Sequence, residues 1–169
     1  MGAMTEPTSP DEPVLVNIRA LVMDPVSKMP VVILQPPERA TFLPIWIGVC
    51  EANAIALKLE GVTTPRPMTH DLIRGLLEAT RYTIRDVLIH ALDDSVFLAT
   101  IHLVDPQGAV IDVDSRPSDA LAVALRTGSP VLVAPQVLQQ AEVRESSEED
   151  AMRTVLERLR PEDLGDYEM

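Results

Sequence analysis

Apolar and polar residues alternate along several segments of the chain, and this alternation predicts β-strands. The clearest case is Val14 to Met23, which has apolar residues on one side and Asn17 and Arg19 on the other. Shorter apolar or alternating runs predict six further strands, at residues 31–34, 42–47, 83–92, 96–104, 109–113 and 131–134. Pro44 indicates that its strand lies at a sheet edge or carries a bulge, because proline has no backbone N–H to donate to a neighbour.

Three other segments have the periodicity of amphipathic helices. They are residues 51–60, 69–79 and 117–126. Pro117 opens the third helix and Gly128 follows it, which is a common pair of start and stop signals. Thr69 is the expected N-cap of the second helix. The apolar side chains that we expect this second helix to bury are Leu72, Ile73, Leu76 and Leu77.

Strands and helices in this order predict an α+β fold with a mixed or antiparallel β-sheet, three main helices and a short C-terminal helix. A chain of 169 residues fits one domain, which we place at residues 14–141. Residues 1–13 are predicted to be disordered, with residues 1–3 a remnant of expression ahead of a native Met4. Residues 142–169 are predicted to form an acidic tail with a short helix.

The first and third helices resemble each other at an offset of 68 residues, from Glu51 to Asp119. The segment from Glu51 to Lys58 aligns with the segment from Asp119 to Arg126: an acid, three alanines, a β-branched residue, a leucine and a base all correspond. This correspondence favours an internal duplication. The alternative is that two alanine-rich buried helices converged on one composition.

The net charge of −12 argues at first against binding to nucleic acid. Most of this charge lies near the chain ends, because residues 1–13 carry −3 and residues 142–169 carry −6, which leaves −3 for residues 14–141. No basic stripe marks a nucleic-acid site, and the chain has one Trp, two Tyr and two Phe, too few for the aromatic pattern of RNA-binding modules. The charge of residues 14–141 therefore neither excludes nor indicates a nucleic-acid site there.

The single cysteine, Cys50, excludes an internal disulfide and favours a reducing, cytoplasmic location. We expect this thiol to be buried and inert. No run of 18 apolar residues predicts a transmembrane helix. The sequence also has no glycine-rich phosphate loop, His-Glu-x-x-His motif, paired cysteines or Gly-x-Ser-x-Gly motif, which argues against common nucleotide hydrolases, zinc enzymes and serine hydrolases.

Two Arg-Pro dipeptides each lead into a helix that has an aspartate in its first turn. Together with the start of the predicted helix at residues 51–60, these two segments contain six candidate site residues. They are Glu51, Arg66, His70, Asp71, Arg116 and Asp119. His70 suits proton transfer near neutral pH, and the two arginines suit bidentate binding of phosphate. The three carboxylates could hold a divalent metal such as Mg or Mn.

The same six residues have a purely structural interpretation as helix caps and ion pairs. His90 and His102 lie in predicted strands, and we expect them to be outward-facing or hydrogen-bonded residues of the sheet.

At these residues the chain resembles the bifunctional nuclease domain family. The matching motifs run from Leu43 to Gly48, from Glu51 to Ala56, from Arg66 to Leu72 and from Asp114 to Arg126, and the resemblance covers roughly residues 14–141. It implies a nuclease that hydrolyses DNA and RNA on an α+β scaffold that self-associates as a homo-oligomer. We expect no membrane partner, because no segment predicts a transmembrane helix. The alternative is a non-catalytic oligomeric module that binds a partner protein or small ligand and uses the polar cluster structurally.

Overall fold

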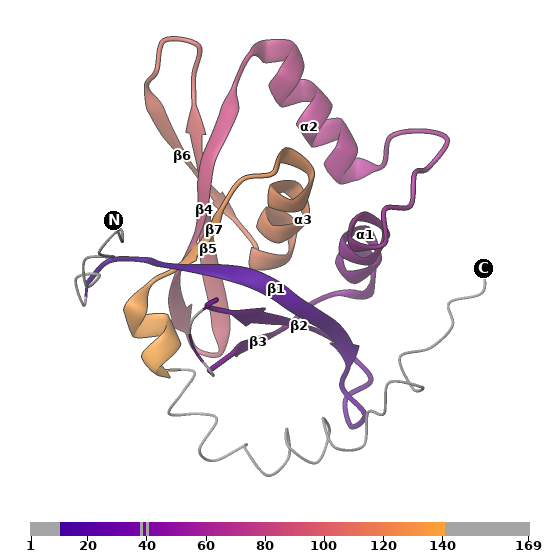
Figure 1. The fold of residues 1–169 in the computed structure, drawn as a ribbon, viewed down its shortest axis with the longest axis vertical. Coiled ribbons are helices and arrows are strands. Elements are labelled where there is room, and N and C mark those ends of the chain that lie inside the picture. Colours follow the sequence, from indigo (N-terminus) through magenta and orange to yellow (C-terminus); the bar gives the residue numbers. More distant parts are fainter. Residues whose placement is uncertain (1–10, 38, 40, 141–169) are drawn as a thin grey trace, which may run out of the picture.

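A computed structural model of the protein describes residues 11–37, 39 and 41–140, and these residues form a mixed seven-stranded sheet with helices packed against it (Figure 1). The strands are β1 (Val14–Met23), β2 (Pro30–Gln35), β3 (Leu43–Trp46), β4 (Thr83–Asp93), β5 (Val96–Val104), β6 (Val110–Ser115) and β7 (Val131–Val133). The helices are α1 (Val49–Leu59), α2 (Thr69–Thr80) and α3 (Pro117–Thr127), and residues 135–140 are also helical. The predicted α+β class is confirmed.

The strand order in the sheet, β3-β2-β1-β7-β4-β5-β6, shows that one unit occurs twice. Each unit is an antiparallel three-stranded meander followed by a helix: β1-β2-β3-α1 and β4-β5-β6-α3. The two helices have 11 residues each, and their first and last residues, Val49 with Pro117 and Leu59 with Thr127, are 68 positions apart. The similarity read from the two helices therefore extends to the strands that precede them.

Strand β7 joins the two units at the centre of the sheet. It pairs antiparallel with β1 and parallel with β4. In Figure 1 the strands of the first unit cross those of the second, and α1 and α3 lie together on one side of the crossing. Helix α3 is buried along most of its length, since small alanine side chains let neighbouring elements approach closely.

The observed elements begin and end close to their predicted limits. β1 and β5 have the predicted bounds, and Pro44 lies in the edge strand β3, as expected. The predicted N-cap of α2 is wrong: the cap is Met68, and Thr69 is the first helical residue. The physical reason is that the Asp71 carboxylate, inside the first turn, accepts the Met68 backbone N–H at 3.0 Å.

Two burial predictions are also wrong. Leu72 and Leu76 on α2 are each 56 % exposed, whereas Ile73 and Leu77 are half-buried. Helix α2 packs on α3, and no element of the described part of the chain covers the side of α2 that carries Leu72 and Leu76. Cys50 is exposed rather than buried, because it lies in the first turn of α1 at the helix surface.

The predictions for residues 1–10 and for the tail at residues 142–169 lie outside the described residues. Among the residues that the structure does describe, no helix is both long and apolar enough to cross a membrane.

The glycine inside α2 gives a direct test of the helix assignment. A Cβ added at Gly75 would meet no atom within 4 Å, so Gly75→Ala should raise the free energy of unfolding by about 0.5–1 kcal/mol in urea denaturation. Gly128→Ala is the control, because Gly128 ends α3 with φ of +70°, a conformation that alanine disfavours. A loss of stability in Gly75→Ala would contradict the assignment.

Candidate functional site

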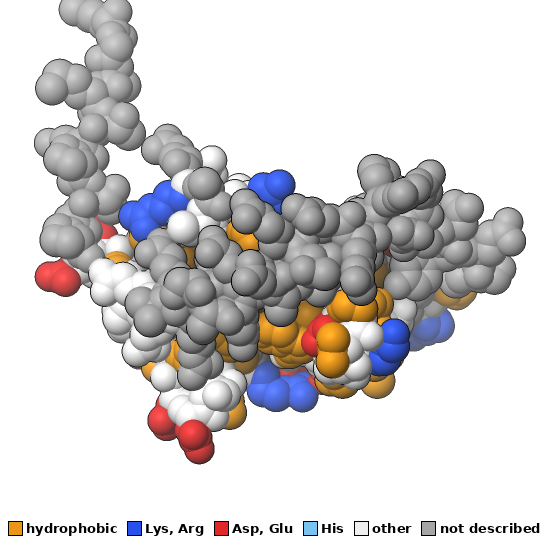
Figure 2. All heavy atoms as spheres, turned by 90° about the horizontal axis from the view of Figure 1, so that it is seen from below, with side chains coloured by type: hydrophobic (Ala, Val, Ile, Leu, Met, Phe, Trp, Pro, Cys, Tyr) orange, Lys and Arg blue, Asp and Glu red, His pale blue; other side chains and the backbone are white. Residues whose placement is uncertain are grey.

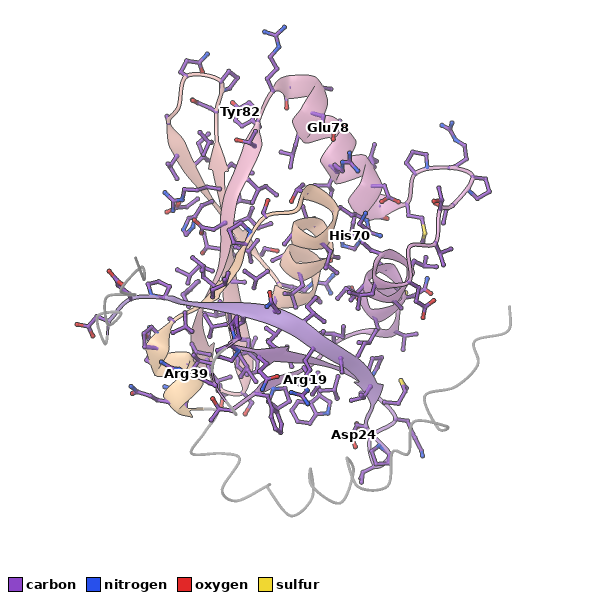
Figure 3. The ribbon with its side chains drawn as sticks, viewed as in Figure 1. Arg19, Asp24, Arg39, His70, Glu78 and Tyr82 are labelled. Atoms are coloured by element: carbon purple, nitrogen blue, oxygen red, sulfur yellow. The ribbon has the colours of Figure 1, made fainter. Side chains whose placement is uncertain are left out.

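The first turns of α1, α2 and α3 meet and form one hydrogen-bonded network of four side chains. His70 Nε2 lies 3.0 Å from Asp119 Oδ1. Arg116, the N-cap residue of α3, donates from Nε to Asp119 Oδ2 at 2.7 Å and from Nη2 to Glu51 Oε1 at 2.6 Å. Figure 3 shows His70 at the start of α2, beside α3 and α1. We call these four residues the helix-start network.

The helix-start network has a buried end and an exposed end. His70 is 7 % exposed, and the Glu51 carboxylate is also largely covered. The Arg116 side chain is 65 % exposed. A ligand arriving from solvent therefore meets the guanidinium first, then Asp119, and the imidazole last.

The charges of the network reinforce one another. Burial by itself would raise the pKa of Asp119, but hydrogen bonds from Arg116 and His70 hold this pKa below its ordinary value. The bonds to Asp119 and then Glu51 raise the pKa of Arg116 above its ordinary value. Asp119 is therefore ionised at neutral pH, and the His70 nitrogen that faces it, Nε2, is the one that carries a proton.

This arrangement leaves the other imidazole nitrogen of His70 available. Within the described residues, Nδ1 of His70 has no hydrogen-bond partner. In a neutral imidazole with its proton on Nε2, Nδ1 is an acceptor. A carboxylate that orients a histidine in this way is a common arrangement around a general base.

Gly48 permits the position of Glu51. Gly48 is the N-cap of α1, and a Cβ added there would overlap the Glu51 carboxylate. In the repeat, Gly48 corresponds to Arg116, so one helix start supplies an arginine and the other supplies room for the carboxylate that binds it.

A second cluster lies beside the network and centres on Arg126. The side chain of Arg126 is 4 % exposed and donates from Nε to Asp71 Oδ1 at 2.7 Å. It also donates from Nη1 to the Ala122 carbonyl at 2.9 Å and from Nη2 to the Ala54 carbonyl at 3.0 Å. Because Ala54 and Ala122 correspond in the repeat, one guanidinium binds equivalent carbonyls of α1 and α3 and also holds α2.

The ionised Asp71 is stabilised from two sides. The Met68 backbone N–H is the main cause that lowers the pKa of Asp71, burial opposes it, and the hydrogen bond from Arg126 lowers the pKa further. Arg126 was not among the predicted site residues. The signal for it was a charged residue two turns after Asp119, on the face of an alanine-rich helix that is otherwise apolar.

The structure thus brings four of the six predicted residues together. Glu51, His70, Arg116 and Asp119 form the helix-start network. Asp71 follows His70 but binds Arg126 instead. The Arg66 side chain is exposed and forms no ion pair within the described residues, and its backbone carbonyl accepts a hydrogen bond from Thr64. The two Arg-Pro helix starts therefore do not occupy equivalent positions.

A histidine in the sheet has a buried partner that sequence reasoning missed. His102 is hydrogen-bonded through Nδ1 to Asp86, as expected for a sheet residue, and Asp86 is buried and also accepts from Arg85 at 2.7 Å. Burial would raise the pKa of Asp86, but the bonds from His102 and Arg85 lower it. Asp112 lies 3.7 Å from the other ring nitrogen of His102.

The three carboxylates that were predicted to hold a metal do not form a common site. Within residues 11–37, 39 and 41–140, no group of three or more His, Cys, Asp or Glu side chains is arranged to hold a metal ion. Glu51 and Asp119 bind Arg116, whereas Asp71 binds Arg126. The donor set as it stands therefore does not fit a metal, and Mg or Mn stays a prediction.

The surface seen in Figure 2 agrees with the sequence, in which no basic stripe marks a nucleic-acid site. On the part of that face that is described, basic and acidic side chains are interspersed among apolar ones and do not gather in one basic stripe.

Comparison with known proteins decides the family. The model of the bifunctional nuclease domain matches residues 32–146. This chain belongs to the bifunctional nuclease domain family. An uncharacterized protein of Mycobacterium tuberculosis is 40 % identical over 144 residues, which are 84 % of this chain and 85 % of that protein. Bifunctional nuclease 1 of Oryza sativa subsp. japonica is 25 % identical over 93 residues, which are 54 % of this chain and 28 % of the plant protein. Family membership and the plant relative support a nuclease-type function at the level of the family.

The cluster around Arg126 should dominate the stability of the three-helix layer. Arg126→Ala leaves Asp71 and two carbonyls without their buried donor and should lower the free energy of unfolding by about 3 kcal/mol. Arg74→Ala is the matched control, because Arg74 forms an exposed pair with Glu78 on α2 and should cost at most about 0.5 kcal/mol. Equal losses in urea denaturation would refute the role given to Arg126.

The lowered pKa of Asp119 predicts a pH dependence. Since the folded state favours the ionised form, its contribution to stability is complete above the ordinary pKa of 3.8 and is lost as the pH falls through the lower folded-state pKa. Asp119→Asn should cost about 1 kcal/mol at pH 7, and this difference from wild type should shrink below pH 4 or so. Asp93→Asn, at an exposed position of β4, is the control. A difference that does not change with pH would contradict the pKa direction.

Proposed function

We propose that this protein is a nuclease that hydrolyses phosphodiester bonds of both DNA and RNA at the helix-start network. The observation that carries the proposal is the imidazole of His70 held by an ionised Asp119, with the exposed Arg116 guanidinium bound to the same carboxylate. A proton acceptor next to a phosphate-binding cation is the minimum that hydrolysis of a phosphodiester needs. Membership of the bifunctional nuclease domain family supports this reaction class.

His70 is the proposed general base. DNA has no 2′-hydroxyl group, so an enzyme that cleaves both nucleic acids by one route needs water as the nucleophile. Nδ1 of His70 accepts a proton as the water oxygen bonds to phosphorus, the bond from phosphorus to the leaving oxygen breaks, and that oxygen takes a proton from solvent. Asp119 stabilises the imidazolium that forms, and the imidazolium then releases its proton to solvent.

Arg116 is the proposed phosphate ligand. Its bonds to Asp119 and Glu51 use Nε and Nη2, so the two N–H groups of Nη1 remain for a phosphate oxygen. Glu51 acts by holding the guanidinium in place. Arg66, exposed on the segment before α2, is proposed to bind a phosphate further along the strand, and Asp71 is proposed to act by positioning the start of α2 through Arg126.

Burial of His70 supports a second candidate function. The His70 side chain is only 8 % exposed and offers little surface to a substrate. Each carboxylate of the network already has a cationic partner. Such a cluster serves equally well to fix three helices in a module that binds a partner or small ligand without catalysis. If this second function is correct, substitutions in the network should lower the stability of the protein, and the wild-type protein should cleave no nucleic acid.

Cleavage of labelled single-stranded RNA and DNA separates the two candidates. If the network is catalytic, His70→Ala should lower the cleavage rate by about 100-fold or more, while circular dichroism shows a folded protein. His90→Ala, prepared identically, is the control, since His90 lies on β4 outside the network. Parallel reactions with EDTA test the predicted need for Mg or Mn.

Each outcome bears on a different part of the proposal. Equal cleavage by wild type and folded His70→Ala would remove His70 from the reaction. Absence of cleavage by wild type with Mg, Mn or neither would favour the non-catalytic module. Cleavage that EDTA abolishes would show that the reaction needs a metal ion.

The homo-oligomer is likewise a proposal. Exposed apolar residues occur on α2, at Leu72 and Leu76, and on the edge strand β6, at Val110, Ile111 and Val113. A second copy of the chain could cover them, and light scattering of the purified protein measures the number of subunits.

A further inference from the structure

A cleft of about 400 Å³ lies between the C-terminal end of α1, residues 62–68 and α2. Its volume falls within the range of small-molecule sites. Asp71 lines the cleft, and the preceding residue, His70, belongs to the helix-start network. The cleft is therefore next to the candidate site but lined by other residues.

Corresponding basic residues of the two repeats line this cleft together. They are Lys58 near the end of α1 and Arg126 near the end of α3, which align at the offset of 68. Lys58 is exposed and forms no ion pair with any other described residue. Arg126 uses three of its five N–H groups on Asp71, Ala122 and Ala54, so one N–H on each Nη remains.

The charges lining the cleft leave a surplus of one positive charge. The two acidic residues are already paired, Asp71 with Arg126 and Glu78 with Arg74. Lys58 is the cation left over. The cleft thus suits a ligand that carries an anionic group with several acceptor oxygens, such as a phosphate.

Apart from Thr63 and Thr64, the uncharged part of the lining is apolar. Leu57, Val62, Pro67 and Met68 contribute apolar side chains. Gly75 forms part of the α2 wall, where a Cβ would meet no atom within 4 Å. A flat heterocycle could lie along this wall, next to the phosphate position.

We propose that this cleft binds a nucleotide, with its phosphate at Lys58 and the remaining N–H groups of Arg126 and its base against the apolar lining. The choice of a nucleotide rests on the proposed function. The bound unit is either a free mononucleotide or one nucleotide of a strand whose neighbouring phosphate reaches Arg116. The chemistry is the same for both sources.

Gly75→Phe is the sharpest test, because Gly75 lines the cleft and is not part of the helix-start network, so the substitution adds bulk at the cleft alone. Titration calorimetry with adenosine 5′-monophosphate, and with a phosphorothioate DNA decamer that resists cleavage, measures binding by the full-length protein. We expect Gly75→Phe to weaken binding by at least about tenfold, with Gly75→Ala close to wild type. Lys58→Glu should also weaken binding, whereas Lys28→Glu, which changes the net charge equally at an exposed position outside the cleft, should not.

The two probes identify the source of the nucleotide. Weaker binding of both in Gly75→Phe indicates a site for free mononucleotides, and weaker binding of the decamer alone indicates a subsite for a strand. Wild-type affinity for both probes in folded Gly75→Phe and Lys58→Glu would overturn the inference, as would wild-type protein that binds neither. The latter result together with cleavage that depends on His70 would leave the proposed function intact. If wild-type protein binds a probe, Gly75→Phe removes this binding, and no cleavage is detected, the nucleotide site would stand and the proposed nuclease function would fail.

Discussion

The arrangement of the three helices depends on the buried guanidinium of Arg126. A buried charge is costly unless it is paired and hydrogen-bonded, and Arg126 meets this condition with a carboxylate from α2 and carbonyls from α1 and α3. Its partner Asp71 also accepts the backbone N–H of Met68 and so fixes where α2 begins. The next residue back, His70, is placed by the same contacts against Asp119. The ion pair of Asp71 with Arg126 thus positions the neighbouring His70 in the candidate site.

The internal repeat explains why this site is asymmetric. Two similar units bring the starts of α1 and α3 together, but the corresponding positions carry different residues. Arg116 of the second unit corresponds to Gly48 of the first, where the absent side chain makes room for the Glu51 carboxylate that binds Arg116. The buried Arg126 of the second unit corresponds to the exposed Lys58 of the first. The histidine comes from α2, which lies between the units in sequence. Neither unit alone contains the site.

Local patterns in the sequence predicted most of the fold, because strand alternation and helix periodicity depend on neighbours in the chain. The bounds of β1 and β5 followed from alternation alone. Exposure of Leu72 and Leu76 could not be predicted, since an apolar stripe does not tell whether another element covers it. The repeat was visible in the helices, where identities align, but not in the strands, where alternation is common to all.

The sequence predicted which residues at the helix starts are candidates for the site, but it did not predict which of them contact one another. Arg66 and Arg116 both precede a proline, yet only Arg116 joins the network, because the segment before α2 leaves Arg66 at the surface. Arg126 and Asp86 were missed because their partners are far away in the sequence. The contacts of Arg126 require the packing of α1 and α2 on α3, and the pair of Asp86 with His102 requires the register of β4 against β5. No local pattern specifies that packing or that register.

Nitrogen-15 spectra of the histidine rings test the central claim, which is that Asp119 holds His70 with Nδ1 free to act on a substrate. The His70 signals are assigned by their loss in His70→Asn, and the protein is titrated with the cleavage-resistant DNA decamer. The account predicts that the single proton of the neutral ring lies on Nε2 in the free protein, and that the Nδ1 shift changes on saturation. An Nδ1-protonated ring, or a spectrum that the bound decamer leaves unchanged, would show that His70 only fixes the helices.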